Sequence, residues 1–523
     1  MAEEKEEKSM LYKLKPLTDR LPAVTRPEGH VHFRTKMTWV ILILVLYFAM
    51  TNIVIYGLDT EEGVDLFAQY RAILAGAQFS LMHLGIGPIV TGSIIMQLFT
   101  GAKIIKLNLK DDEDKAVYQG TQKLMVIIMI VVESVPQVYG FMAPSDKFGL
   151  NMESLWAGHG QSLAMTIIVL QLIVGSYLVF LMDEVVSKWG IGSGISLFIA
   201  AGVAQQIFTG SLNWHPSDPL ARISTENAPA GTIPKTIYLF HHMSASDLTS
   251  GGYEQIFLRQ PNPMVALIGT IVIFLFVAYT ESSRIELPLA HGGARGARGR
   301  YPIKLIYASN IPVILMAAVL ANISMFSMLF WGRFENVPVL GHNWMIGYYN
   351  DTDTTRAAGG LAYYLSTVNG LGDWLLPMVS QNYMASYGLD KSTTQIGIHV
   401  IVYLAVMIFG SILFAKFWIE TTNMGPEAVA SQIESSGMQI PGFRRDPRVM
   451  KRVLERYIPV VTVISGATVG ALAGLADLIG TVGSASGTGV LLAVGIMIQL
   501  YDAIGREQMM EMHPVLRGFF GGE

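Results

Sequence analysis

Residues able to do chemistry are scarce in this 523-residue chain, and the clearest ones lie inside long apolar runs. Glu133 and Asp477 are the ionisable side chains that stand out there, with Asn310 and Asn322 as polar neighbours. A carboxylate within an apolar span is a candidate functional group. A proton-coupled carrier would align several acids along a path, whereas Glu133 stands nearly alone. We therefore expect Glu133 to act in a gate or in helix packing.

The sequence contains no motif for nucleotide, zinc or acyl chemistry. It has no Walker lysine loop, no His-Glu-x-x-His helix and no Gly-x-Ser-x-Gly turn. It also has no cysteine, which excludes disulfides, thiolate metal sites and cysteine nucleophiles. We therefore predict that the chain is not an enzyme and carries no cofactor and no metal.

The stretch Leu84–Leu98 is apolar, yet it opens with two glycines and Pro88. A helix that served only as an anchor would avoid this start, because Gly and Pro weaken regular hydrogen bonding. At membrane depth, irregular backbone survives only where protein or a water-filled cavity satisfies it. We expect a half-helix in this stretch, with residues 67–79 folded into a cavity before it.

Aliphatic residues spaced by four recur in this stretch and in the glycine-rich stretch 190–199. Residues four apart stack on one helix face, so two helices can direct branched side chains at a common point. The pairs predict an apolar constriction in a pore. Their members are Ile86 with Val90 and Ile195 with Ile199.

The composition is that of a membrane protein: 51% of residues are hydrophobic and 15% are charged, with a mean hydropathy of +0.42. Soluble domains carry about 25% charged residues. Ten apolar runs approach the length of about 20 residues that a membrane span requires. They cover 37–56, 84–100, 124–142, 161–182, 191–209, 263–280, 303–331, 397–419, 457–481 and 485–503.

Ten spans place both termini on one side of the membrane. Lys and Arg are concentrated on that side, which holds 28 of the 36, so both termini are expected to be cytoplasmic. Transport proteins of this size are commonly two halves with inverted topology. The predicted parts are a cytoplasmic segment with a short interfacial helix (1–36), a first half (37–209), an external loop (210–262), a second half (263–503) and a cytoplasmic tail (504–523).

Two cytoplasmic loops of the second half, 281–304 and 420–456, are basic. In the first, glycines alternate with arginines between His291 and Arg300, which disfavours a stable helix and leaves the cations available. Arginine forks of this kind suit a phosphate-rich partner. A second interpretation, that these arginines only set the orientation in the membrane, stays open.

Several long motifs resemble the SecY family, the central subunit of the protein-conducting channel, and most of all its archaeal and eukaryotic members. The likeness runs from about Tyr12 to the C-terminus and thins in the outer loops. The motifs that carry it are Leu84–Gln97, Asp183–Ile195, Pro288–Gly292, Tyr301–Lys304 and Ser309–Leu315. The resemblance implies an all-α polytopic membrane protein, with ten transmembrane helices in two pseudo-symmetric five-helix halves around a central pore.

The resemblance also implies roles for single residues. The pore ring of the family falls on Ile86, Val90, Ile195, Ile199, Ile314 and Leu492. The plug helix falls on about 68–78, with Ala68, Ile73, Leu74, Ala75, Gly76, Ala77 and Gln78 as its members. The lateral gate falls on Thr91, Glu133 and Asn310. Contacts to the ribosome fall on Arg295, Arg298, Arg300, Arg444 and Arg445.

The resemblance implies that this subunit passes unfolded polypeptides across the membrane and releases transmembrane segments sideways into lipid. Expected partners are a SecE-type and a SecG- or Sec-beta-type small membrane subunit, the ribosome, signal peptides, nascent polypeptides and the lipid bilayer. The expected place is the cell membrane, as a multi-pass protein of an archaeal plasma membrane. The alternative weighed is a secondary transporter of a small solute, which predicts polar ligands at mid-membrane.

Overall fold

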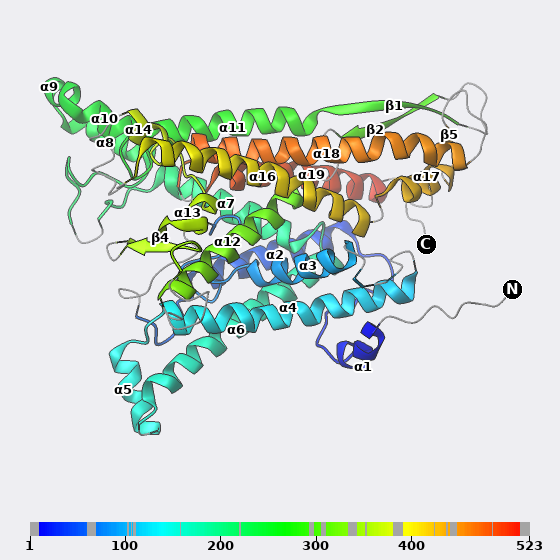
Figure 1. Ribbon diagram of the computed structural model, residues 1–523, viewed down its shortest axis with the longest axis horizontal. Helices are drawn as coiled ribbons and strands as arrows, with labels where there is room; N and C mark the ends of the chain where they lie inside the picture. The colour runs from blue at the N-terminus through cyan, green and yellow to red at the C-terminus, as the bar shows by residue number, and fades with distance from the viewer. Residues whose placement is uncertain are drawn as a thin grey trace.

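Long helices stacked side by side along one axis make up most of the molecule (Figure 1). The computed structural model describes residues 10–59, 70–101, 104–105, 107, 111–156, 158–218, 221–291, 298–304, 310–332, 343–350, 353–379, 391–422, 424–435, 438–439, 447–483 and 485–512.

Nine helices in the described part of the chain are long and apolar enough to cross a membrane. They are α2 (Phe33–Asn52), α4 (Asp112–Phe141), α6 (Gly160–Trp189), α7 (Gly194–Leu212), α11 (Met264–Ser282), α12 (Ile311–Gly332), α16 (Thr393–Thr421), α18 (Pro447–Ile479) and α19 (Gly487–Met512). The tenth, α3 (Gly87–Gly101), has 15 residues, which is too short to span a bilayer of about 30 Å. Each of the ten overlaps one predicted apolar run.

Shorter elements gather at the two ends of the helix stack (Figure 1). One end carries η1 (Met10–Leu14), α1 (Lys15–Thr18), the strands β1 (Arg284–His291), β2 (Arg298–Lys304) and β5 (Met438–Gln439), and α17 (Pro426–Ser435). The other end carries α5 (Asp146–Leu155), α8 (Thr232–His242), α9 (Ala245–Asp247), η2 (Leu248–Gly252), α10 (Tyr253–Phe257), β3 (Tyr348–Asn350), β4 (Asp353–Gly359), α13 (Gly360–Leu365) and α14 (Leu375–Val379).

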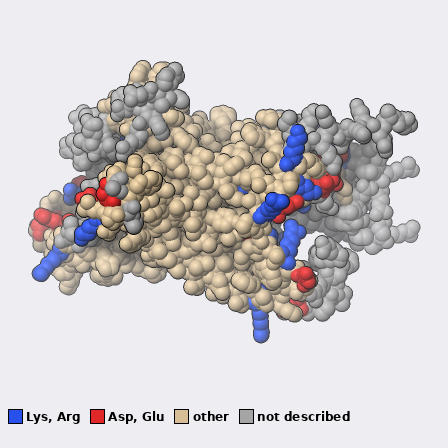
Figure 2. All heavy atoms as spheres, turned by 90° about the horizontal axis from the view of Figure 1, so that it is seen from below, with Lys and Arg blue, Asp and Glu red and all other residues tan. Residues whose placement is uncertain are grey.

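Charge follows the same division. Figure 2 shows Lys, Arg, Asp and Glu toward the two ends of the visible face, with a broad uncharged band between them. The helices crossing this band expose large apolar side chains, such as Ile271 and Leu275 on α11 and Phe409 on α16. Since a bilayer solvates apolar surface and excludes charge, this band is the membrane-embedded part.

The helices pack as two groups around one apolar core. In Figure 1, α11, α16, α18 and α19 lie in the upper part and α2, α3, α4 and α6 in the lower part. The groups meet where α7 packs on α19 and where α12 packs on both α3 and α16. One buried apolar cluster runs through both groups, so the core is continuous across their boundary.

The structure corrects three predictions made from apolarity and composition. Residues 284–291 and 298–304 pair as an antiparallel hairpin, so 281–304 is not merely a loop and residues 303–304 belong to a strand rather than to a span. The first span ends at Asn52 and not at 56, because Val54 leaves the helix to pair with Ser80. The predicted plug helix is not a helix over its described residues 70–78, which form a turn.

Candidate functional site

The six aliphatic residues assigned to the pore ring come from separate parts of the chain and share one core. Five are members of the same buried cluster, and Ile195 packs against that cluster. The exposed fraction is 0% for Ile86, Ile199 and Leu492, and the other three are also largely covered. They lie on the turn before α3, on α3, α7, α12 and α19. The full set, which we call the aliphatic waist, is Ile86, Val90, Ile195, Ile199, Ile314 and Leu492.

The segment Tyr70–Gln78 lies against this aliphatic group. Ile86 donates its backbone N–H to the carbonyl of Leu74 over 2.8 Å, which joins the segment to a ring residue. A Cβ built on Gly85 would lie 2.1 Å from the Leu74 oxygen, and Gly85 has a φ of +55°. Only glycine combines that backbone with so close an approach. Ala68 lies outside the described residues.

Two helices of different groups hold the other side of this segment. On α7, a Cβ at Gly202 would lie 3.6 Å from the Cα of Ala75. On α19, a Cβ at Gly489 would lie 3.7 Å from the Cβ of Ala72. The segment is therefore enclosed between α3, α7 and α19.

The gate residues do not form one cluster. Thr91 and Glu133 interact beside the start of α3, and Thr91 also accepts a hydrogen bond of 3.1 Å from Asn322 Nδ2 on α12. Asn310 instead packs on α19, where a Cβ at Gly495 would overlap its amide nitrogen. The Thr91–Asn322 bond joins α3 to α12, whereas Asn310 lies against α19.

Several buried polar atoms at these positions lack partners. Among the described residues, Glu133 Oε1, Asn322 Oδ1 and both amide atoms of Asn310 have no hydrogen-bond partner. An unmade hydrogen bond in a buried site costs about 1–3 kcal/mol. These four atoms therefore make this region less stable than a fully apolar contact would be.

The residues assigned to ribosome contacts are placed only in part. Arg298 and Arg300 lie on β2, where they pair in register with Ala290 and Pro288 of β1. Arg295, Arg444 and Arg445 lie outside the described residues. The hairpin projects from the end of the molecule that also carries α17 (Figure 1).

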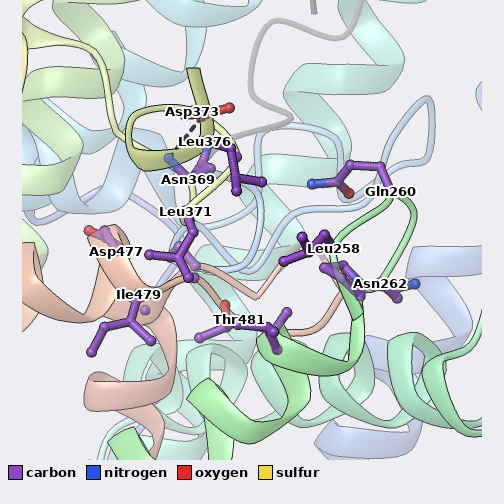
Figure 3. Close-up of a pocket in the computed structure, with 18 of the residues that line it drawn as sticks. Leu258, Gln260, Asn262, Asn369, Leu371, Asp373, Leu376, Asp477, Ile479 and Thr481 are labelled. Carbon is purple, nitrogen blue, oxygen red and sulfur yellow. Dashed lines mark hydrogen bonds between the residues drawn. The ribbon is translucent and has the colours of Figure 1, made fainter. Parts of the chain in front are cut away.

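A cavity lies away from the aliphatic group, at the end opposite the hairpin (Figure 1). It has a volume of about 540 Å³ and is formed where three segments meet (Figure 3). They contribute Gln260 and Asn262 before α11, Asn369 and Asp373 before α14, and Thr481 after α18. None of the six ring residues lines it, so this cavity is not the predicted conduit.

Comparison with known proteins decides the family. A family model described as SecY matches residues 80–501, and a second, described as the plug domain of Sec61p, matches residues 45–78. The chain belongs to the SecY family. Named SecY relatives match it over nearly its whole length: that of Haloferax volcanii is 46% identical over 97% of this chain and 98% of the relative. The SecY of Archaeoglobus fulgidus is 43% identical over 98% of this chain and 99% of the relative.

Solved structures of SecY and Sec61 channels share the fold. A protein-conducting channel structure is 37% identical, covers 96% of this chain and 98% of its own, and superposes with a TM-score of 0.73. Sec61 from a canine ribosome–channel complex is 37% identical, covers 96% of this chain and 98% of its own, and superposes with a TM-score of 0.70. This chain is therefore a ten-helix multi-pass membrane protein with the architecture of these channels.

Proposed function

We propose that this chain is the pore-forming subunit of a protein translocation channel. It passes unfolded polypeptides across the membrane and releases transmembrane segments sideways into lipid. The observation that carries the proposal is the shared apolar core around Ile86, Ile199 and Leu492, with the segment Tyr70–Gln78 packed beneath it. The SecY relatives are named protein translocase subunits, which supports the same function for this chain.

The aliphatic waist suits a moving polypeptide because it offers no fixed polar partner. A ring of branched side chains can close around an extended chain and resists water and ions by dewetting. One solved relative, 37% identical, is described as having a plug domain that stabilises the closed state and maintains a membrane seal. We assign that role to about residues 68–78, of which Ile73, Leu74 and Ala75 are buried.

Sideways release follows from partitioning at the seam. A segment of about 20 apolar residues is more stable in lipid than in an aqueous pore, whereas polar chain continues outward. We assign the seam to the contact of α3 and α4 with α12, with Thr91, Glu133 and Asn310 as its polar residues. The amide of Asn310 has no hydrogen-bond partner within the described part of the chain, which supports this assignment. An unpaired buried amide makes the closed contact less stable and so makes it easier to open.

The cytoplasmic side is assigned to the end with the β1–β2 hairpin. The described N-terminal element η1, the end of α19 and the hairpin share that end, where the positive-inside rule expects Lys and Arg (Figure 1). This orientation makes both termini cytoplasmic, in an archaeal plasma membrane given the archaeal relatives. We keep the division into 1–36, 37–209, 210–262, 263–503 and 504–523 as part of this proposal.

The partners proposed are a SecE-type subunit, a SecG- or Sec-beta-type subunit and the translating ribosome. One solved relative is Sec61 in a ribosome–channel complex, which supports the last of these. Contacts to ribosomal RNA would come from Arg295, Arg298, Arg300, Arg444 and Arg445. Since this channel has no nucleotide motif, its partners must supply the driving force.

Reconstitution tests this function. The chain, co-purified with its small subunits in lipid vesicles, should protect a signal-bearing polypeptide from added protease when ribosomes or another driving partner are present. The same polypeptide without its signal is the control and should stay digestible. Uptake of amino acids or sugars without any polypeptide transport would instead support a secondary transporter, an alternative that the SecY relatives do not support.

A further inference from the structure

A buried polar relay connects the segment Tyr70–Gln78, which we call the plug, to helix α4. It centres on His83, whose side chain is 1% exposed, in the turn that leads from the plug into α3. Neither the aliphatic waist nor the gate includes this histidine. Its ring and its backbone together touch both ends of the plug and one residue of α4.

On the plug side, His83 makes two hydrogen bonds. Its Nδ1 accepts the backbone N–H of Phe79 over 3.0 Å, and its carbonyl accepts a hydrogen bond of 3.1 Å from Arg71 Nη1. The rings of His83 and Phe79 also stack, with centroids 5.9 Å apart and planes 4° from parallel. Arg71 lies at the beginning of the described plug and Phe79 follows its end, so His83 fixes both ends.

On the helix side, the amide of Gln137 on α4 lies 2.9 Å from His83 Nε2. Because Nδ1 accepts a hydrogen bond, the neutral ring carries its hydrogen on Nε2. The ring therefore donates to Gln137, which must present its amide oxygen. This orientation also gives Gln137 Oε1 a partner that it otherwise lacks among the described residues. The Phe79 N–H thus fixes the tautomer, and Gln137 fixes the direction of the ring.

The same face of α4 carries the gate residue Glu133. Residues four apart on a helix lie one above the other, so a shift of α4 that moves Glu133 away from α3 also moves Gln137 away from His83. Both side chains are 1% exposed. The gate contact and the plug contact therefore lie one turn apart on the same helix, on either side of Pro136.

The plug backbone is held in a conformation that favours release. Ala75 and Phe79 have φ values of 52° and 53°, in the left-handed region that residues other than glycine rarely adopt. Such conformations persist only where surrounding contacts impose them. At Phe79 the contact is the bond to His83, and at Ala75 it is a 3.1 Å hydrogen bond from Tyr47 Oη on α2.

We propose that Gln137, acting through His83, holds the resting plug in place, so that displacement of α4 at the seam frees the plug. Gln137 and His83 are positioning residues in this account. The proposal rests on the proposed function, since it assigns a role to a plug and a gate. It adds the specific contacts by which the movement of one reaches the other.

The chain has no cysteine, so a single engineered thiol reports on the plug. Ala75→Cys places it on a side chain that is 1% exposed in the resting state. We expect Gln137→Leu to raise the rate at which N-ethylmaleimide labels this thiol about tenfold, the effect of about 1.4 kcal/mol. The resting ion conductance of the reconstituted complex should rise with it.

Gln122→Leu is the matched control. Gln122 lies on the same helix and donates a 2.8 Å hydrogen bond to Ser93 Oγ on α3, yet no described contact joins it to the plug. It should leave labelling unchanged. Tyr47→Phe, which removes the direct bond to Ala75 and keeps the ring, is the positive control and should raise labelling by itself.

The outcomes separate the relay from the function on which it rests. The relay is supported if Gln137→Leu labels faster than wild type and Gln122→Leu does not. The two variant complexes should then have the same thermal midpoint. Equal labelling of wild type and Gln137→Leu, in a complex that still transports a signal-bearing polypeptide, overturns the relay and leaves the channel function standing. Equal acceleration by Gln122→Leu also overturns it. A complex that transports no polypeptide overturns both.

Discussion

Asp183 and Asp477 occupy equivalent places at opposite ends of the molecule. Asp183 Oδ1, near the end of α6, accepts the backbone N–H of Ile195 in the first turn of α7 over 2.9 Å. Asp477 Oδ1, near the end of α18, accepts the N–H of Thr488 in the first turn of α19 over 2.8 Å. The two helix pairs run in opposite directions in Figure 1, so the same capped turn recurs with inverted topology.

Asp477 should contribute more to stability than Asp183. Besides the bond to Thr488 N, it accepts 2.6 Å hydrogen bonds from Tyr403 Oη and Thr488 Oγ1, which join α16, α18 and α19. Asp477→Ala should lower the free energy of unfolding by about 3 kcal/mol, because it leaves buried hydroxyl groups unpaired. Thermal unfolding of the purified complex measures this. A smaller loss than for Asp183→Ala would contradict it.

Polar substitution of the waist should make the resting channel leak. Burying an Ile side chain contributes about 1.5–3 kcal/mol, so Ile86→Asn should favour wetted states about tenfold or more. We expect higher ion conductance in planar bilayers and transport of substrates with weakened signal sequences. Ile271→Asn, on the exposed face of α11, should change neither property. Equal conductance of the Ile86 variant and the wild type would argue against the waist as the seal.

Gly85→Ala should displace the plug. The added Cβ would lie 2.1 Å from Leu74 O, at a φ of +55° that already disfavours alanine. The result expected is raised resting conductance with the helices intact by circular dichroism. Gly158→Ala is the control, since that residue has a φ of +82° but no described atom within 4 Å of the new Cβ. If both variants conduct alike, backbone strain rather than the clash is responsible.

The region around α8 should become more stable as pH rises above 8. Lys235 on α8 is 3% exposed, and its Nζ donates to the carbonyls of Arg259 (2.7 Å) and Pro261 (3.1 Å). Burial, with the nearby charge of Arg259, lowers the pKa of Lys235 to about 8. A lysine in the unfolded chain titrates with a pKa of about 10.4. Between these values the unfolded state binds more protons, so the free energy of unfolding increases with pH.

Thermal midpoints measured from about pH 7 to 10 for wild type and Lys235→Met isolate this effect. The difference between the two proteins should shift in favour of the wild type as pH rises through the window from about 8 to 10.4. A difference that does not change with pH would show that Lys235 keeps an ordinary pKa in the folded protein.

Apolarity in the sequence located all ten membrane helices but not their full length. The run predicted at 124–142 is part of α4, which begins at Asp112, and the run at 457–481 is part of α18, which begins at Pro447. Hydropathy marks only the lipid-facing portion of a helix. The polar first turns of α4 and α18 extend into water, where packing against α1 and α17 supports them. Such tertiary support leaves no local pattern.

Spacing and resemblance named the six aliphatic residues that share one buried core, whereas neither named the relay. Ile86 and Val90 share a face by their separation of four, which any helix imposes. His83 and Gln137 are 54 positions apart, and nothing in the spacing of either predicts a hydrogen bond. The sequence shows only that both residues are polar within apolar stretches. Polar residues that merely stabilise helix packing show the same pattern. The hairpin β1–β2 was missed because its glycines and arginines resemble a loop.

Site-specific photo-crosslinking of a stalled nascent chain tests the central claim most directly. Probes at Ile86, Ile195 and Ile314 should crosslink the polar, translocating part of that chain, whereas probes at Ile271 and Leu275, which are 52% and 62% exposed on α11, should not. Crosslinks at all three core positions and none at the two control positions are the predicted result. A nascent chain that reacts with the α11 positions and leaves the core positions unlabelled would contradict a polypeptide path through this apolar waist.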